Sequence, residues 1–242
     1  SLLDSIYRIL TDGGIHSPSL REIEQADAVL ILGEDVTHSA PRLALSLRQS
    51  VRNATIELAR TMHIPIWQDI AIRELTGQAR SPLVIVSQCA TRLDDVATGT
   101  FRGSPDDIAR LGFAVAHHLD RAAPEVVNLS AAEQSQAAAI ADALKQAKRP
   151  LVVSGTSCSS LAVVQAAYNI AKALQAPKKQ LTFTLPECNS IGLATLGGGR
   201  LQQAFETINR GLADTVVILE NDLYRRASRE HVDRFLTTAA HV

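Results

Sequence analysis

Short apolar runs recur along the chain and alternate with stretches whose apolar residues follow helical spacing. The runs are AVLIL (28–32), IPIW (64–67), PLVIV (82–86), PLVVS (150–154), LTFTL (181–185) and TVVIL (215–219). Continuous apolar runs this short are typical of strands that are buried on both faces of a parallel sheet. Strands that alternate with helices predict an α/β fold with right-handed crossover connections.

Helix-start signals stand between these runs. One helix is predicted over about 41–62. Others are predicted to begin at Ser104, at Ser130 and near Ser228, and a further one follows SGTSCSS and ends at about Leu174. Ser104 is a predicted N-cap, and Pro105 suits the first helical position because its missing N–H is not needed there. Ser130 precedes Glu133 by the spacing of a capping box. The order of these signals supports the alternation of strands and helices.

One ten-residue pattern occurs twice. ADAVLILGED at 26–35 and ADTVVILEND at 213–222 share six of ten residues in register. Glu220 stands in the second copy where the first copy has Gly33. The stretch RAAPEVVNLS (121–130) is predicted to connect two lobes, so that each lobe contains one copy of the pattern.

Composition is that of a packed globular protein. Of the 242 residues, 46% are hydrophobic and 20% are charged, and the formal net charge is −1. This balance gives no basic stripe, so no nucleic-acid partner is expected. The apolar runs are too short to cross a bilayer, so no direct membrane insertion is expected. Because the chain begins at Ser1 and shows no targeting segment, we expect it to be a piece of a longer protein.

The cysteines do not form a metal-binding pattern. Cys89, Cys158 and Cys188 are widely spaced, with no CxxC pair and no Cys/His cluster. An iron–sulfur or zinc site built from this chain alone is therefore not expected. An odd number of cysteines without a disulfide framework fits a reducing compartment.

The loop after the first apolar run carries hydrogen-bond donors ahead of a predicted helix. Gly33 permits close approach of the backbone, and Thr37, His38 and Ser39 supply donors. In an open α/β sheet, ligands bind at the carboxyl ends of the strands, so this loop is a candidate anion site. The alternative is an ordinary strand–turn–helix connection with a capping residue.

The loop SGTSCSS after the fourth run resembles a nucleophile elbow, G-x-S-x-G, whose last glycine is replaced by Ser159. Ser157 is the candidate nucleophile, and Cys158 near a helix start is a candidate activated thiolate. The interpretation we favour is a turn of small residues, starting at Gly155, that lets the following helix pack on the sheet.

The order of motifs resembles that of the molybdopterin oxidoreductases over nearly the whole chain. IHSPSLREIEQADAVLILGEDVTHSAPRLALSLRQSVRN resembles their segment in which a strand ends in G-x-N-P-x-x-x-x-P. SPLVIVSQCATRLDD resembles their strand that ends in D-P-R, and FRGSPDDIARLGFAVAHHL resembles their P-G-[ST]-D-x-A-L helix. KRPLVVSGTSCSS, NSIGLATLG and ADTVVILENDLYRRA follow in the order of the later lobe. Within this family the chain is most similar to the large iron–sulfur subunits of bacterial respiratory complex I.

This resemblance implies a fold and a cellular setting. It implies two Rossmann-like αβα lobes with mainly parallel sheets, over residues 1–125 and 126–242, the completeness of the second being left open. The implied parent transfers electrons from NADH to quinone, coupled to proton translocation, on the cytoplasmic side of the inner membrane. Its partners would be the other peripheral-arm subunits, and its iron–sulfur clusters would lie upstream of Ser1. This stretch would be a non-catalytic scaffold without a cofactor.

Departures from the family pattern suggest that a pterin-binding fold was kept after its cofactor was lost. Asp35-Val36 replaces N-P, Gln88 replaces the aspartate of D-P-R, and Glu220 replaces a glycine. A carboxylate would repel a cofactor phosphate, and a Cβ would block close approach of the backbone. No catalytic residue and no metal ligand is predicted.

The residues expected to line any remaining anion pocket are Gly33, Thr37, Ser39, Asp106 and Gly155. Two alternatives stay open at this point. One is the pterin-dinucleotide-binding part of an active molybdenum oxidoreductase. The other is a small hydrolase or thiol enzyme that uses Ser157 or Cys158.

Overall fold

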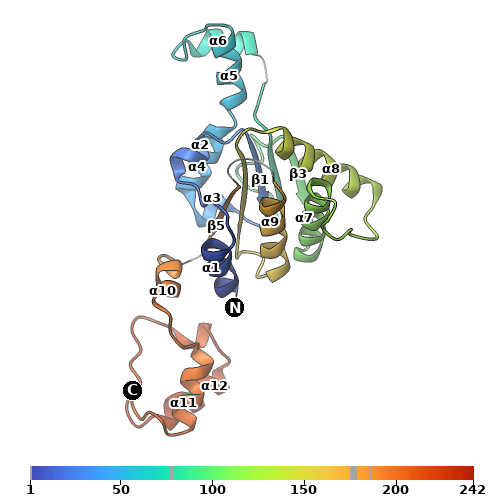
Figure 1. Cartoon of the computed structure of the whole chain (residues 1–242). Helices are drawn as coiled ribbons and strands as arrows, with labels where there is room; N and C mark the ends of the chain where they lie inside the picture. The colour runs from blue at the N-terminus through green and yellow to red at the C-terminus, as the bar shows by residue number, and fades with distance from the viewer. Residues whose placement is uncertain (1, 77–78, 175–178, 186) are drawn as a thin grey trace. The chain divides into compact units, whose positions relative to one another are not determined.

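The computed structural model describes residues 2–76, 79–174, 179–185 and 187–242 (Figure 1). The chain forms two compact units, residues 1–191 and residues 192–242. The first unit contains the sheet and most of the helices, and each unit is described by itself below.

Five parallel strands form one sheet in the described part of the first unit. They are β1 (Ala28–Leu32), β2 (Leu83–Ser87), β3 (Gly99–Arg102), β4 (Pro150–Gly155) and β5 (Gln180–Thr184), in the spatial order β3-β2-β1-β4-β5. The central strand is β1, whose Val29 pairs with Leu83 of β2 on one side and with Leu151 of β4 on the other. The predicted α/β class and parallel sheet are confirmed.

The described part of this unit also contains helices. They are α1 (Leu2–Asp12), α2 (Leu20–Glu24), α3 (Val36–Ser39), α4 (Pro41–Ser50), α5 (Asn53–Thr61), α6 (Asp69–Thr76), α7 (Pro105–Leu119), α8 (Ala131–Gln146) and α9 (Leu161–Ala173), with α10 (Ser190–Leu196) at the boundary of the two units. The predicted caps are confirmed: Ser104 forms a capping box with Asp107 at α7, and Ser130 forms one with Glu133 at α8. Each box satisfies backbone N–H groups that the first helical turn leaves without partners.

The core lies on both faces of β1. Leu30 and Leu32 belong to the cluster built with α7, α8 and α9, whereas Val29 and Ile31 belong to the cluster built with α2 and α4. All five residues of β1 are buried, which is why this strand reads as a continuous apolar run. Each fully buried aliphatic side chain of this kind stabilises the fold by roughly 1.5–3 kcal/mol.

The second unit is small and mainly helical. It contains α11 (Leu201–Asn209), the short 3₁₀ helix η1 (Leu223–Arg225) and α12 (Arg229–Thr238). Phe205 of α11 packs against Phe235 of α12 with ring centroids 4.8 Å apart, and Val232 is fully buried beside them. None of the helices described in either unit is long and apolar enough to cross a membrane.

The structure differs from the expectation of two sheets. Strands from both expected lobes, β1 and β4, pair in the same sheet, and the described residues of 192–242 contain no sheet of their own. The expected boundary at residues 125 and 126 stays a prediction; it falls between α7 and α8. The run at 215–219 is not a strand here, and neither is the run at 64–67, where Pro65 lacks a backbone donor and Trp67 is 79% exposed.

Two further elements differ from the sequence prediction. The helix predicted over 41–62 is divided into α4 and α5, because the Val51 carbonyl accepts the Ser81 N–H (2.9 Å) instead of continuing the helical ladder. The strand β3 was not predicted, since it lacks a continuous apolar run and none of its residues is buried.

Candidate functional site

The order of the strands places a switch point between β1 and β4. From β1 the chain moves to β2 and β3 on one side, then crosses back to β4 and β5 on the other. The loops that follow β1 and β4 lead to helices on opposite faces of the sheet. In open α/β folds the crevice between such loops is where ligands bind, so this is the candidate functional site.

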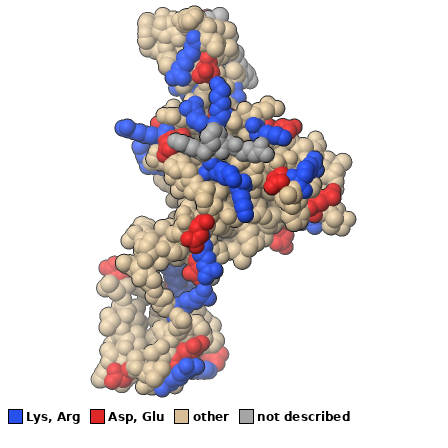
Figure 2. All heavy atoms as spheres, viewed as in Figure 1, with Lys and Arg blue, Asp and Glu red and all other residues tan. Residues whose placement is uncertain are grey.

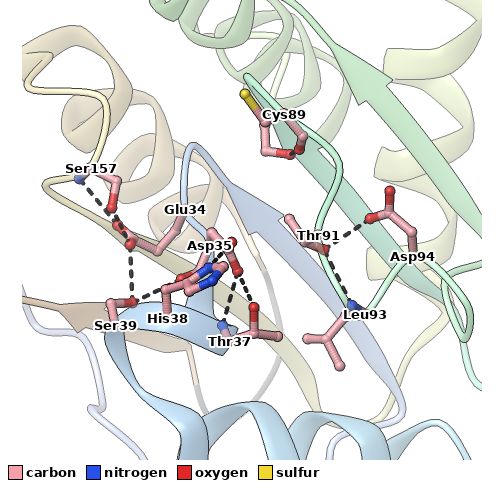
Figure 3. Close-up of polar contacts among 11 residues, drawn as sticks. Glu34, Asp35, Thr37, His38, Ser39, Cys89, Thr91, Leu93, Asp94 and Ser157 are labelled. Carbon is pink, nitrogen blue, oxygen red and sulfur yellow. Dashed lines mark hydrogen bonds and ion pairs between the residues drawn. The ribbon is translucent and has the colours of Figure 1, made fainter.

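A buried carboxylate fills this crevice. Glu34 lies two residues past the end of β1, is 2% exposed, and is the only charged side chain among the buried residues that the structure describes. Its Oε1 accepts hydrogen bonds from Ser39 Oγ (3.1 Å) and from Ser157 Oγ, and its Oε2 accepts the Ser157 N–H at 3.3 Å. Figure 3 shows Ser157, from the loop after β4, meeting Glu34 and Ser39, from the loop after β1. These donors offset the loss of water around a buried charge.

The two predicted glycines make room for this arrangement. A Cβ at Gly155 would overlap Glu34 Oε2 and lie 2.5 Å from Thr184 Oγ1. Gly33 has a φ of +74°, and a Cβ there would lie 2.6 Å from Val163 Cγ1 in α9. The groups that approach the backbone closely at these two glycines are therefore side chains of the protein itself.

Asp35, the next residue, caps α3. Its Oδ1 accepts the Thr37 N–H at 3.0 Å and the Thr37 hydroxyl at 2.5 Å, and its Oδ2 lies 2.6 Å from His38 Nδ1. Partial burial raises the pKa of Asp35, but the hydrogen bonds from Thr37 and His38 outweigh burial and hold it below its ordinary value. The donors predicted for an external anion, Thr37 and His38, thus serve a local carboxylate (Figure 3).

The loop after β2 is hydrogen-bonded to the loop after β4. Cys158 Sγ lies 3.6 Å from Gln88 Oε1 and donates to the Gly33 carbonyl at 3.2 Å. Farther along the same loop, Asp94 accepts the Thr91 hydroxyl at 2.9 Å and pairs with Arg102 at the end of β3. The loops after β1, β2 and β4 are therefore joined to one another or to the sheet by internal hydrogen bonds.

Neither Ser157 nor Cys158 has the surroundings of an activated nucleophile. Burial, and then the negative charge of Glu34, raises the pKa of the Cys158 thiol, which disfavours the thiolate. Ser157 donates its proton to Glu34, and no imidazole is hydrogen-bonded to it among the described residues. The positive φ in this loop is at Ser159 (+48°), whereas an elbow places its strain at the nucleophile.

The five predicted pocket residues are not all brought together. Gly33, Ser39 and Gly155 lie around Glu34, whereas Thr37 is hydrogen-bonded to Asp35. Asp106 is exposed on the first turn of α7, and no hydrogen bond among the described residues joins it to Glu34. Glu34 itself was missed by the sequence prediction, although a carboxylate between Gly33 and the capping Asp35 at a strand end was the available signal.

The site does not fit the cofactors that the family resemblance implies. The donors that would receive a dinucleotide phosphate, the Ser39 hydroxyl and the Ser157 N–H, are already hydrogen-bonded to the buried Glu34 carboxylate. For metals, no group of three or more His, Cys, Asp or Glu side chains that could hold an ion is found within the described ranges. We therefore assign neither group a role at this crevice.

Comparison with known proteins gives consistent matches. The G subunit of NADH-quinone oxidoreductase from Pseudomonas fluorescens is 45% identical over 236 residues, which are 97% of this chain and 26% of that protein. The Escherichia coli K12 protein of the same name is 45% identical over 239 residues, and the Shewanella oneidensis one is 47% identical over 241 residues; each match covers 98% of this chain and 26% of that protein. No protein-family model matches the chain.

These matches confirm the resemblance inferred from the motifs. The chain spans about a quarter of the length of the relatives it matches, and nearly all of it is aligned. The chain is therefore homologous to one region of the NADH-quinone oxidoreductase G subunits.

Proposed function

We propose that this region is a non-catalytic scaffold within a subunit of the peripheral arm of respiratory complex I. The parent would transfer electrons from NADH to quinone, coupled to proton translocation, on the cytoplasmic side of the inner membrane. Its iron–sulfur clusters would be bound by other parts of the polypeptide. The role of the present stretch would be to pack and to contact neighbouring peripheral-arm subunits. The similarity to the NADH-quinone oxidoreductase relatives supports this setting.

The observation that carries the proposal is the position of Glu34. In dinucleotide-binding folds the switch point receives a phosphate, held by backbone N–H groups and hydroxyls. Here the Ser157 N–H and the Ser39 hydroxyl donate to a carboxylate of the chain itself. A phosphate about 4 Å from that carboxylate would be repelled by about 4 kcal/mol at an effective dielectric constant of roughly 20. The crevice is therefore closed to the ligand that the ancestral fold would bind.

The surface of the chain is consistent with a protein partner more than with a nucleic acid. Acidic and basic side chains are interspersed on the face shown in Figure 2, and the whole chain has a formal net charge of −1. Nucleic-acid binding would require a clustered basic footprint.

The alternative is the pterin-dinucleotide-binding part of an active molybdenum oxidoreductase. The two functions differ in what Glu34 does, so an anion titration of three variants separates them. Pyrophosphate and ADP would be titrated calorimetrically into the native chain, Glu34→Ala and Glu34→Gln, with Asp106→Ala as a control that removes an exposed carboxylate.

We expect no saturable binding to the native chain or to Asp106→Ala. Glu34→Ala should bind pyrophosphate weakly, with a dissociation constant on the order of 1 mM, because donors become free and the repulsion is removed. Glu34→Gln, which keeps the shape but not the charge, should bind more weakly than Glu34→Ala. Saturable ADP binding to the native chain that weakens in Glu34→Ala would overturn the proposal.

A further inference from the structure

The segment between α4 and β2 forms a helical hairpin, α5–α6, outside the core of the first unit. At its base the Ser81 N–H donates to the Val51 carbonyl at 2.9 Å. Beside this bond the Thr55 hydroxyl donates to the Ala79 carbonyl at 2.6 Å. Neither core cluster of the sheet contains a described residue of α5 or α6, and Figure 1 shows the two helices projecting away from the sheet. The hairpin is therefore an arm that the packing of the sheet does not require.

The end of this arm exposes large apolar side chains. Trp67, in the turn before α6, is 79% exposed, and Ile70 in α6 is 76% exposed. Ile66 beside them is 51% exposed. A cluster of exposed apolar residues on a folded domain marks an interaction site, and tryptophan is among the residues that contribute most to protein–protein binding.

These side chains border a groove with an acidic rim. The groove has a volume of about 610 Å³ and is lined by Trp67, Gln68, Asp69, Ile70, Ala71 and Glu74. Asp69 is paired with Arg52 at 3.0 Å, whereas Glu74 is exposed and has no ion-pair partner in the described part of the chain. A binding partner must therefore be apolar opposite Trp67 and Ile70 and carry a positive charge opposite Glu74.

The acidic rim disfavours two other occupants. In a symmetric dimer each copy would contribute the same groove, so Glu74 would meet acidic side chains and not basic ones. An anionic membrane surface would repel Glu74 for the same reason. A protein segment with a basic side chain next to an apolar one satisfies both features of the groove.

We infer that the α5–α6 hairpin docks on a neighbouring subunit, on a segment that places an apolar side chain against Trp67 and a Lys or Arg beside Glu74. This inference rests on the proposed function, because it takes the neighbour to be another peripheral-arm subunit. It assigns the contact to the hairpin and not to the crevice around Glu34, where the polar groups are hydrogen-bonded to one another.

Fluorescence tests the starting point, since Trp67 is the single tryptophan of the chain. In the isolated chain, acrylamide should quench its emission almost as efficiently as that of free tryptophan. Weak quenching would mean that the chain itself covers Trp67, which would overturn the inference.

Photo-crosslinking tests the partner in the assembled complex. The full-length subunit would carry p-benzoylphenylalanine in place of Trp67, and cross-linked peptides from the intact complex would be identified by mass spectrometry. The control carries the same amino acid in place of Glu57, an exposed residue of α5 that is paired with Arg60 and does not line the groove. Position 67 should cross-link to another subunit, at a peptide with a Lys or Arg close to the attached residue, at least about tenfold more than position 57.

The other outcomes contradict docking on a neighbour. Attachment to the same polypeptide, to a second copy of it, to lipid, or to a peptide without a basic residue would overturn the inference, as would equal yields at the two positions. A failed cross-link in an intact complex that lacks molybdenum and pterin would leave the proposed function standing. Stoichiometric molybdenum with pterin would instead overturn the proposed function.

Charge reversal provides a second readout. Glu74→Lys should repel the basic side chain of the partner and Trp67→Ala should remove the apolar contact, whereas Glu57→Lys reverses a charge on the same hairpin outside the groove. Thermal unfolding of the variant chains would check that the hairpin still folds. The first two variants should release the cross-linked subunit from the complex at least about tenfold faster, and Glu57→Lys should change the rate by less than about twofold. Native-like release rates in Trp67→Ala and Glu74→Lys would overturn the inference.

Discussion

Gly33 and Glu220 share a left-handed backbone at equivalent positions of a repeated segment, although one is a glycine and the other a glutamate. An L-residue in this conformation is strained by roughly 1–2 kcal/mol because its Cβ approaches the following carbonyl oxygen. The turn was therefore retained in the second copy without the residue that forms it most easily.

Replacing Glu220 with glycine should stabilise the second unit. The relief of strain exceeds the entropy lost by ordering a glycine, so we expect a gain of about 0.5–1 kcal/mol in the free energy of unfolding. Chemical denaturation followed by near-ultraviolet circular dichroism would measure this change. Glu206→Gly, within helix α11, is the control and should destabilise the same unit by about 1 kcal/mol. A destabilised Glu220→Gly variant would contradict the strain at this position.

The reverse change at Gly33 should be harmful. Gly33→Ala adds a Cβ that would lie 2.6 Å from Val163 Cγ1, in addition to the strain of the positive φ. We expect a loss of about 2–4 kcal/mol in the stability of the first unit. Gly14→Ala, where φ is also positive but nothing lies within 4 Å of the added Cβ, isolates the strain from the overlap. Equal effects of the two substitutions would show that the packing against α9 contributes nothing.

Removing the Ser157 hydroxyl should destabilise the fold, because the buried Glu34 carboxylate loses a hydrogen-bond donor. Ser157→Ala leaves Glu34 with one hydroxyl donor fewer, so we expect a loss of about 1–3 kcal/mol in unfolding free energy. Ser159→Ala removes a hydroxyl from the same loop at an exposed position and should change stability by less than about 0.5 kcal/mol. Thermal and urea unfolding of both variants would test this, and a Ser157→Ala variant as stable as Ser159→Ala would contradict the role of Ser157.

Cys158 should be the slowest cysteine to alkylate. Its pKa is raised by burial and by Glu34, while Cys89 and Cys188 are exposed. In the folded chain at pH 8, iodoacetamide should modify Cys158 at least about tenfold more slowly than Cys89. Peptide mass spectrometry over a time course would measure the rates. Preferential labelling of Cys158 at low reagent concentration would instead favour a thiol enzyme.

The capping box of α2 predicts a specific acid dependence of stability. The Ser19 backbone N–H, and then the contact with His16, lowers the pKa of Glu22 from 4.5 to about 2. Because the pKa is lower in the folded state, the contribution of Glu22 is fully present above pH 4.5 and is lost as the pH falls through about 2.

Glu22→Gln should therefore be less stable than the native chain at pH 6, with the difference shrinking below pH 4.5. Glu57→Gln, at an exposed carboxylate of α5 paired with Arg60, is the matched control and should show a smaller change. Urea unfolding between pH 2.5 and pH 7 would be the measurement. A stability difference that grew toward low pH would contradict the lowered pKa.

The sequence predicted those strands whose own apolar pattern indicates burial on both faces. The run at 28–32 is apolar at every position because β1 has one face on α7–α9 and the other on α2 and α4. The runs at 64–67 and 215–219 have a similar composition, but most of their side chains remain exposed in this chain. An apolar composition shows that a segment can be buried. Whether the segment pairs in a sheet depends on which other strands are present.

The candidate site shows a similar limit. Gly33, Ser39 and Gly155 could be named from the sequence because small and hydroxyl residues at strand ends are recognisable there. The sequence marks Glu34 as a carboxylate at a strand end but does not reveal its partner Ser157, because their hydrogen bond joins residues 123 positions apart across the switch point. Only the strand order brings these two loops together.

The molybdenum and tungsten content of the full-length protein, purified from cells grown with both metals, decides between a scaffold and an active pterin-dependent oxidoreductase. Inductively coupled plasma mass spectrometry would be combined with an assay for released pterin, and iron would be measured in the same sample as a check on cofactor loading. We predict that molybdenum, tungsten and pterin are each present at well below one-tenth of an equivalent per polypeptide. Stoichiometric molybdenum or tungsten together with pterin would contradict the scaffold function.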